Sequence, residues 1–175
     1  QNAAVNTDNQ QIDTFSFNAT SSVLTLEIED DAQPAQTVNL SSLNPTKAVA
    51  RIILSANQAE TGSGITKVNF DTEDFDIGNN FNLTTDEFEV PADGIYRVHT
   101  QISMGSSTST GTFDVRIRVD GNQVRRTAFD HPGNGTIIRQ NTSLLELTAG
   151  QVIDIAFLRA DAITINANNA LSYFE

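Results

Sequence analysis

Four arginines on one predicted hairpin are the side chains of this sequence best suited to binding chemistry. Arg116 and Arg118 lie before a predicted Asp-Gly turn, and Arg125 and Arg126 lie after it. Since side chains alternate along a strand, Arg116 and Arg118 share one face. Their guanidinium groups can hold carboxylate, phosphate or sulfate groups of a surface polysaccharide through charge-assisted hydrogen bonds. The alternatives are a solvated face, or ion pairs with the acidic region 71–93 of the same or a neighbouring subunit.

Two polar, turn-rich segments, 105–111 and 130–136, are the predicted recognition loops. Loops held on a rigid β scaffold commonly make the contacts with a partner. His131 and Asn134 in the second segment therefore join the four arginines as predicted receptor-binding residues. The alternative is that both segments simply connect strands.

Catalysis requires a nucleophile, a base or a metal ion held within reach of one another, and this sequence offers few such groups. It contains two histidines, His99 and His131, and no cysteine. No Gly-x-Ser-x-Gly elbow occurs, and the glycine-rich segments 62–64 and 105–111 lack the Gly-Lys-Ser/Thr ending that binds phosphate. We therefore predict that the protein is not an enzyme.

The carboxylates of Asp71, Glu73, Asp74 and Asp76 are oxygen ligands of the kind that calcium prefers. Their order does not fit the twelve-residue calcium loop, which needs ligands at alternate positions and a closing glutamate. A solvated acidic loop is the favoured interpretation. No cofactor is predicted and no metal ligand is assigned, although calcium stays open as an alternative.

Composition limits the partners. The net charge of -12 argues against nucleic acid, because binding to phosphates needs clustered Lys and Arg. No run of 18 apolar residues occurs, so no membrane insertion is predicted. Without cysteine, neither a disulfide framework nor a thiolate metal site is available. A chain of 175 residues can hold one domain of ordinary size and a short appendage.

The appendage is predicted to be residues 1–46, which contain no Lys or Arg and six acidic residues. Three short runs within it alternate apolar and polar residues, which predicts strands in hairpins. A sheet this small needs something to pack against. It resembles the β-rich stalk segments of bacterial and phage fibres, in which three chains wrap together. The alternative is a partly ordered linker.

The remaining residues, 47–175, are predicted to form an all-β head. Short strands recur from Ala48 onward between Gly, Pro and Asn turns, and no window shows a helical period. Many short strands of this kind indicate a sandwich of two sheets.

One segment, 88–102, resembles the hallmark strand of the superfamily that contains the complement C1q globular head and tumour necrosis factor. It combines a Pro/Gly turn, a Gly-x-Tyr triplet at Gly94 and a Thr-Gln-Ile ending. Three other segments resemble family strands in the family's order, at 67–88, 143–155 and 171–175. The resemblance covers about residues 48–175 and implies a homotrimeric jelly roll placed on a short N-terminal β stalk.

The resemblance also implies which residues meet in the trimer. Tyr96, His99, Gln101 and Tyr173 are expected at the interface, with Phe174 pointing into the sandwich. Three copies of His99 are then expected near the threefold axis, where repulsion between protonated imidazoles would loosen the trimer in acid. The alternative is a hydrogen-bonded imidazole without such an effect.

We expect the protein to be the non-enzymatic trimeric head of an extracellular spike or fibre on a phage virion. Its expected function is attachment to the host-cell surface. The expected partners are two further copies, a cell-surface glycan or protein receptor, and an anchoring capsid, fibre or cell-surface protein bound through the N-terminus. A bacterial adhesin or surface structural protein, secreted or on the cell surface, is the alternative. A cytokine-like ligand and a glycan-degrading spike are weaker alternatives.

Overall fold

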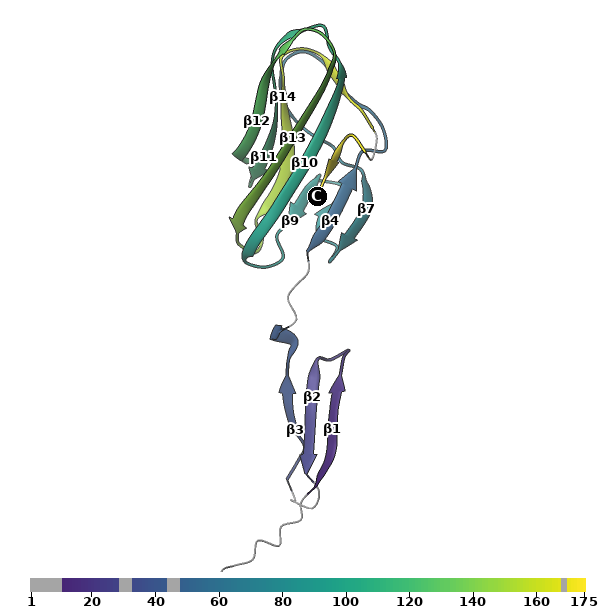
Figure 1. The fold of residues 1–175 in the computed structure, drawn as a ribbon, viewed down its shortest axis with the longest axis vertical. Coiled ribbons are helices and arrows are strands. Elements are labelled where there is room, and N and C mark those ends of the chain that lie inside the picture. Colours follow the sequence, from purple (N-terminus) through teal and green to yellow (C-terminus); the bar gives the residue numbers. More distant parts are fainter. Residues whose placement is uncertain (1–10, 29–32, 44–47, 168–169) are drawn as a thin grey trace, which may run out of the picture. The chain divides into compact units, whose positions relative to one another are not determined.

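The structure is a computed structural model that describes residues 11–28, 33–43, 48–167 and 170–175. The chain divides into two compact units, Gln1–Pro45 and Thr46–Glu175. The first unit contains a small antiparallel sheet and the second contains two larger facing sheets (Figure 1). No helix among the described residues is long and apolar enough to cross a membrane.

The N-terminal sheet has the strand order β1-β2-β3. Its strands are β1 (Ile12–Asn18), β2 (Val23–Ile28) and β3 (Gln36–Asn39), followed by the short 3-10 turn η1 (Ser41–Leu43). The Asn18 side chain ends β1 by accepting hydrogen bonds from the backbone N–H groups of Thr20 and Ser21, at 2.9 and 3.1 Å. Strands therefore form where the period-two pattern predicts them.

The first sheet of the head, called the β10 sheet, contains five antiparallel strands. The long strands β10 and β13 run side by side in it (Figure 1). Its order is β13 (Thr136–Leu147), β10 (Gly94–Ser106), β16 (Tyr173–Phe174), β4 (Val49–Ile53) and β7 (Thr72–Ile77).

The second sheet of the head, called the β11 sheet, faces the first. Its order is β12 (Asn122–Pro132), β11 (Thr110–Val119), β14 (Val152–Arg159), β9 (Glu87–Glu89) and β8 (Phe81–Asn82), with β6 (Gly64–Lys67) also paired to β14. A separate two-stranded sheet joins β5 (Gln58–Glu60) to β15 (Ile163–Ile165).

The chain crosses between the two sheets after β10, β12 and β13, because β11, β12 and β14 lie in one sheet while β10 and β13 pair in the other. This arrangement is an all-β jelly roll, as the sequence predicted. The predicted Asp-Gly turn joins β11 to β12, with Asp120 and Gly121 both at positive φ.

The core fills the space between the two sheets with every second residue of the long strands. On β11, Phe113, Val115 and Ile117 are completely buried. At the C-terminus, the Phe174 ring lies 6.1 Å from Phe70 and about the same distance from a second core phenylalanine. The expectation that Phe174 points into the sandwich is therefore confirmed.

Candidate functional site

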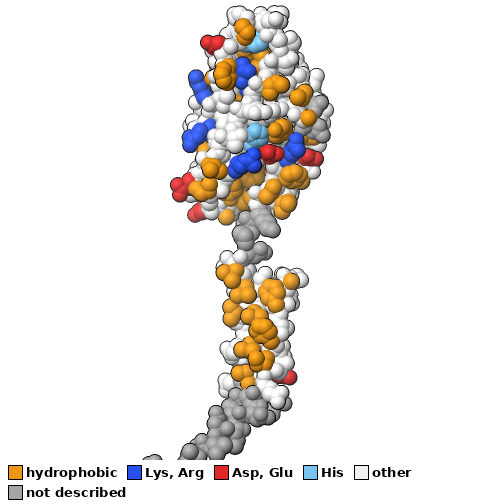
Figure 2. Space-filling model, in the orientation of Figure 1, with side chains coloured by type: hydrophobic (Ala, Val, Ile, Leu, Met, Phe, Trp, Pro, Cys, Tyr) orange, Lys and Arg blue, Asp and Glu red, His pale blue; other side chains and the backbone are white. Residues whose placement is uncertain are grey.

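Six large apolar side chains are exposed on the outward face of the β10 sheet, each between 43% and 67% accessible. The strand register places them together, since residues opposite each other on paired strands point to the same side. Figure 2 shows hydrophobic side chains gathered among charged ones on the head. The six side chains are Val49, Phe75, Ile77, Ile95, Ile138 and Leu144.

A polar cluster lies on the same face. The His99 imidazole contacts Thr142 through Nδ1, at 2.5 Å from the hydroxyl oxygen, and Tyr173 through Nε2, at 3.1 Å from the phenol oxygen. The guanidinium of Arg51 lies 4.7 Å from the centroid of the Tyr173 ring. Both ring nitrogens of His99 thus have partners within one chain, and these contacts orient the Tyr173 ring on the sheet surface.

Gln101 is the neighbour of Tyr173 in the sheet and is only 8% exposed. Its amide nitrogen donates to the carbonyl oxygens of Ala170 and Leu171, at 3.0 and 3.1 Å, and its amide oxygen accepts from Gln140. Gln101 therefore holds the C-terminal segment against β10.

The structure brings His99, Gln101 and Tyr173 together but places Tyr96 on the other side of β10. Tyr96 packs against the core, and its hydroxyl donates to the carbonyl of Ala92 at 2.7 Å. Tyr96 and His99 are three residues apart, so a strand period of two puts them on opposite faces. The spacing alone could have separated them.

Two of the four arginines are held in ion pairs within the β11 sheet. Arg116 donates twice to Asp114, at 2.7 and 3.0 Å, and the Asp114 side chain is completely buried. Arg118 donates to Asp154 at 2.6 Å, and that carboxylate is only 3% exposed. These partners lie outside the region 71–93 that the sequence suggested.

The other two arginines are exposed and point to different sides of the sheet. Arg126 lies opposite Arg116, with its guanidinium 4.0 Å from the Asp114 carboxylate. Arg125 lies opposite the buried Ile117, and its guanidinium donates to a neighbouring backbone carbonyl. Three of the four arginines therefore pair with the carboxylates of Asp114 and Asp154, although the Arg126 side chain is half exposed, and Arg125 points to the other side of the sheet.

The two predicted recognition loops pack against each other. Ser107 of the first loop donates its N–H to the carbonyl of Gly135 in the second, at 3.1 Å. The His131 imidazole is only 7% exposed, contacts the Ser107 carbonyl at 3.1 Å and meets the Phe113 ring edge to face. His131 thus joins the loops from inside, whereas Asn134 is exposed.

Replacing Gly133 by Ala is expected to disturb this loop pair and to lower the free energy of unfolding by about 2 kcal/mol. A Cβ atom at Gly133 would lie 2.8 Å from the backbone oxygen of Thr108. Gly135→Ala is the control, because its φ is also positive but nothing lies within 4 Å, so about 1 kcal/mol is expected. Equal losses in urea unfolding would contradict a close approach at Gly133.

The acidic segment serves the local fold. Burial alone would raise the pKa of Asp71, but hydrogen bonds from the Ser55 hydroxyl and N–H outweigh it and hold the pKa below its ordinary value. The Asp76 carboxylate accepts from the N–H of Phe81 at 2.8 Å. Over the described ranges, no group of three or more His, Cys, Asp or Glu side chains could hold a metal ion.

Lys67 binds Glu87 at 2.7 Å and lies 3.8 Å from Asp154. The hydrogen bond from Lys67 holds the pKa of Glu87 below its ordinary value. Burial raises the pKa of the adjacent Asp86, and the charge of Lys67 opposes that rise. A depressed carboxyl pKa adds stability above the unfolded-state pKa, and that stability is lost as pH falls through the folded-state pKa.

Lys67→Met is therefore expected to raise the pKa of both Glu87 and Asp86 and to cost about 1 kcal/mol at neutral pH. Titration of the side-chain carboxyl carbons by NMR measures both pKa values. Arg125→Met, which removes the same charge elsewhere, serves as control and should leave them unchanged. If the pKa of Glu87 stayed low in Lys67→Met, a group other than Lys67 would be responsible for lowering it.

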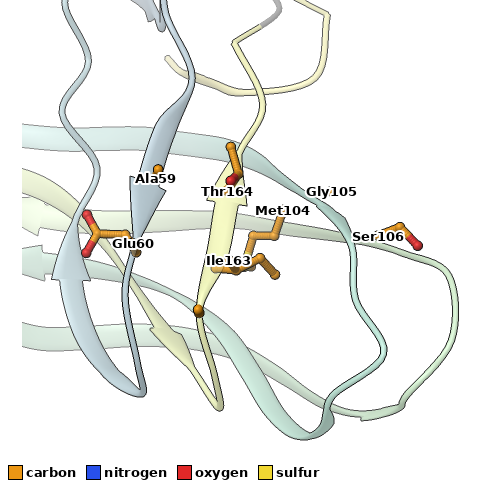
Figure 3. A pocket seen from close by; sticks show the side chains of 8 residues that line it. Ala59, Glu60, Met104, Gly105, Ser106, Ile163 and Thr164 are labelled. Atoms are coloured by element: carbon orange, nitrogen blue, oxygen red, sulfur yellow. The ribbon is translucent and has the colours of Figure 1, made fainter.

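Two hollows in the head were not predicted from the sequence. One, of about 390 Å³, lies where β5 and β15 run beside the end of β10 (Figure 3). Its Glu60 carboxylate already binds Arg159 at 3.3 Å. The other, of about 600 Å³, is lined by Glu73, Glu89 and residues 79–83, which include strand β8. The first hollow is assembled from segments distant in sequence, so no local pattern marks it, whereas the lining residues of the second all lie within residues 73–91.

The jelly roll defines the class of C1q/TNF-like domains, which are typically trimeric, extracellular and non-enzymatic. Residues 52–175 match the family model of the C1q domain, and the chain belongs to this family. The resemblance predicted from residues 88–102 is thereby confirmed. No curated protein matches the chain in sequence.

Solved structures share the fold at low sequence identity. A crystal structure of murine APRIL at pH 5.0 is similar with a TM-score of 0.59 and 16% identity, covering 73% of this chain and 95% of that one. The globular domain of zebrafish complement 1qA has a TM-score of 0.50 and 12% identity, over 73% and 94%. Eiger TNF from S. frugiperda has 0.51 and 15%, over 71% and 87%.

Proposed function

We propose that this protein is the homotrimeric, non-enzymatic head and stalk of an extracellular spike or fibre that attaches a virion to the host-cell surface. The observation that carries the trimer is the set of six exposed apolar side chains on the outward face of the β10 sheet. Contiguous apolar patches on soluble monomers are small, and larger ones mark interaction sites. A second and a third copy are the partners that membership of this class favours.

The polar cluster fits the middle of such an interface. His99, Gln101 and Tyr173 already have partners in their own chain, so packing them against other copies leaves few polar atoms unsatisfied. The surrounding apolar side chains supply the area to be buried, at about 25 cal/mol per Å². Arg97 and Glu146 are exposed on the same face, so the proposed interface combines a satisfied polar centre with apolar side chains and these two opposite charges.

Receptor binding is assigned to groups that the proposed interface leaves accessible. Asn134 on the paired loops and the exposed Arg125 and Arg126 are such groups. Arg116 and Arg118 are bound by carboxylates, and His131 is buried, so these three act by supporting their neighbours. Three copies of a weak glycan or protein site on one particle gain apparent affinity through multivalency. The N-terminal unit provides the connection to an anchoring capsid, fibre or cell-surface protein.

The first test is the native mass of residues 1–175 in solution. Three chains of 18.9 kDa give 56.7 kDa, and a monomer at 18.9 kDa would overturn the trimer. An unchanged native mass between about pH 8 and about pH 5 would reject acid loosening through His99. The same experiment distinguishes loosening of the trimer in acid from the alternative, a hydrogen-bonded His99 imidazole without such an effect.

The second test incubates the trimer with polysaccharide purified from the host surface. Binding without new saccharide ends supports attachment, whereas falling viscosity and new reducing ends would indicate a glycan-degrading spike. Arg125→Ala and Arg126→Ala are expected to weaken binding, with Ile65→Ala on the exposed β6 strand as control. Virion structural genes beside the coding sequence support a spike, and secretion genes support a bacterial adhesin.

A further inference from the structure

We propose that one face of the N-terminal sheet is an interaction surface for the same face of two other copies, so that β1, β2 and β3 of three chains build one stalk. The inference deepens the proposed function and rests on its trimer. The proposed partner of the N-terminal sheet is the apolar face of an identical sheet in another copy.

The strand register separates the two faces of this sheet. Phe15 lies opposite Leu26, and Phe17 lies opposite Leu24, which in turn lies opposite Val38. Residues opposite each other point to the same side, so these five apolar side chains form one continuous face. We call it the stalk apolar face.

The other face of the sheet is polar. Ser16 lies opposite Thr25, and Thr25 lies opposite Thr37, which sets a row of hydroxyl groups across all three strands. Glu27 lies two residues after Thr25 on β2, so its side chain points to the same face. Its carboxylate accepts a hydrogen bond from Thr14. The sheet therefore has one side suited to water and one side suited to an apolar partner.

The stalk apolar face is uncovered within a single chain. No residue of β1, β2 or β3 is buried. Phe15 is 70% exposed, Phe17 56% and Val38 55%. Figure 2 shows hydrophobic side chains gathered on the N-terminal sheet. An uncovered apolar face leaves so small a sheet marginal in water, and a partner that covers this face would stabilise it.

The distribution of charge in the N-terminal unit indicates that the partner of the stalk apolar face is itself apolar. The stalk apolar face contains no charged residue, and residues 1–46 contain no Lys or Arg and six acidic residues. An acidic partner would be repelled, and a basic partner would find no carboxylate on this face. Three identical faces turned toward one another cover the five side chains of the stalk apolar face and leave the row of hydroxyl groups in water.

Chain connectivity favours the same copies that form the head trimer. Four residues, 44–47, join Leu43 to Ala48, so the connection spans at most about 18 Å. The next strand, β4, belongs to the β10 sheet, whose outward face is the proposed head interface. Trimeric heads therefore hold three N-terminal sheets at high effective concentration, which favours their association.

Single cysteines in the full chain test this proposal, because the chain has none of its own. Leu24→Cys and Leu26→Cys are placed on the stalk apolar face, and Thr25→Cys on the same strand points to the other side. Facing sheets pack about 10 Å apart, so a bismaleimide of that reach should link the first two variants between chains. Covalent dimers on a denaturing gel should be several-fold more abundant than for Thr25→Cys.

The native mass of each sample separates the two proposals. If the mass is trimeric but Leu24→Cys and Leu26→Cys are cross-linked no more than Thr25→Cys, the stalk inference is overturned and the head trimer still stands. Monomeric mass without cross-links overturns both. Preferential linking of Thr25→Cys also overturns the inference, because the polar face would then be inside.

Hydrogen exchange of the unsubstituted chain gives a measurement that no substitution can disturb. In the trimer, the amides of β2 are expected to exchange at least about tenfold more slowly than those of an unfolded peptide. Exchange at unfolded rates in a sample of trimeric mass would overturn the inference, since an uncovered sheet of this size is marginal in water.

Discussion

Replacing Leu144 by Glu is expected to convert the proposed trimer into monomers at low micromolar concentration. Leu144 is 67% exposed in the single chain and lies on the outward face of the β10 sheet. It is opposite Arg97, which is two residues before His99 on β10. Each copy would lose about 1.5–3 kcal/mol of apolar burial. Each copy would also bring a carboxylate out of water, at an effective cost of several kcal/mol.

Ile65→Glu is the matched control for this prediction. Ile65 is 53% exposed and lies on β6, at the β11 sheet, so the same change there should leave the native mass at 56.7 kDa. Mass photometry or sedimentation measures both variants, and circular dichroism checks that the β content is kept. A trimeric Leu144→Glu protein would place the interface on another surface of the head.

Replacing Arg116 by Met is expected to lower the free energy of unfolding by about 3–5 kcal/mol. The Asp114 carboxylate is completely buried and receives two hydrogen bonds from Arg116. Without them it would be a buried charge whose next cation is Arg126, at 4.0 Å. Removal of one member of such a pair costs more than removal of both.

Two further variants make this prediction specific. Arg125→Met removes an exposed guanidinium of the same hairpin and should change stability by less than about 0.5 kcal/mol. The double variant Asp114→Leu with Arg116→Met should recover most of the loss, because neither partner is left unpaired. Urea unfolding is compared at one protein concentration, since trimer formation couples assembly to stability. Equal small losses in Arg116→Met and Arg125→Met would return Arg116 to the candidates for receptor binding.

Parts of the site could be predicted from the residues. The family resemblance led to His99 and Gln101 on the Gly-x-Tyr strand and to Tyr173 on the closing strand, and the structure brings these three together on one face. Tyr96 was grouped with them although its odd spacing from His99 already places it on the other face. Asp114 and Arg116 are also two residues apart, so the same rule could have identified them as partners.

Other contacts had no local signal. Arg118 binds Asp154, 36 residues later in the chain, because β11 and β14 pair in one sheet. His131 is buried because the loop after β10 folds over it and Phe113 packs against its ring. A turn-rich polar segment looks the same in sequence whether it is exposed or packed against a second loop.

The all-β class, the strands of the N-terminal sheet and the turn at Asp120 could be predicted from the residues, because they depend on the period-two pattern and on turn chemistry. The family could be identified from the resemblance of residues 88–102 to its hallmark strand. Local patterns could not predict the pairing of β10 with β13 and β16, the ion pair between Arg118 and Asp154, or the position of the exposed apolar side chains on one face. Those outcomes depend on which distant strands become neighbours, and a local pattern carries no information about that choice.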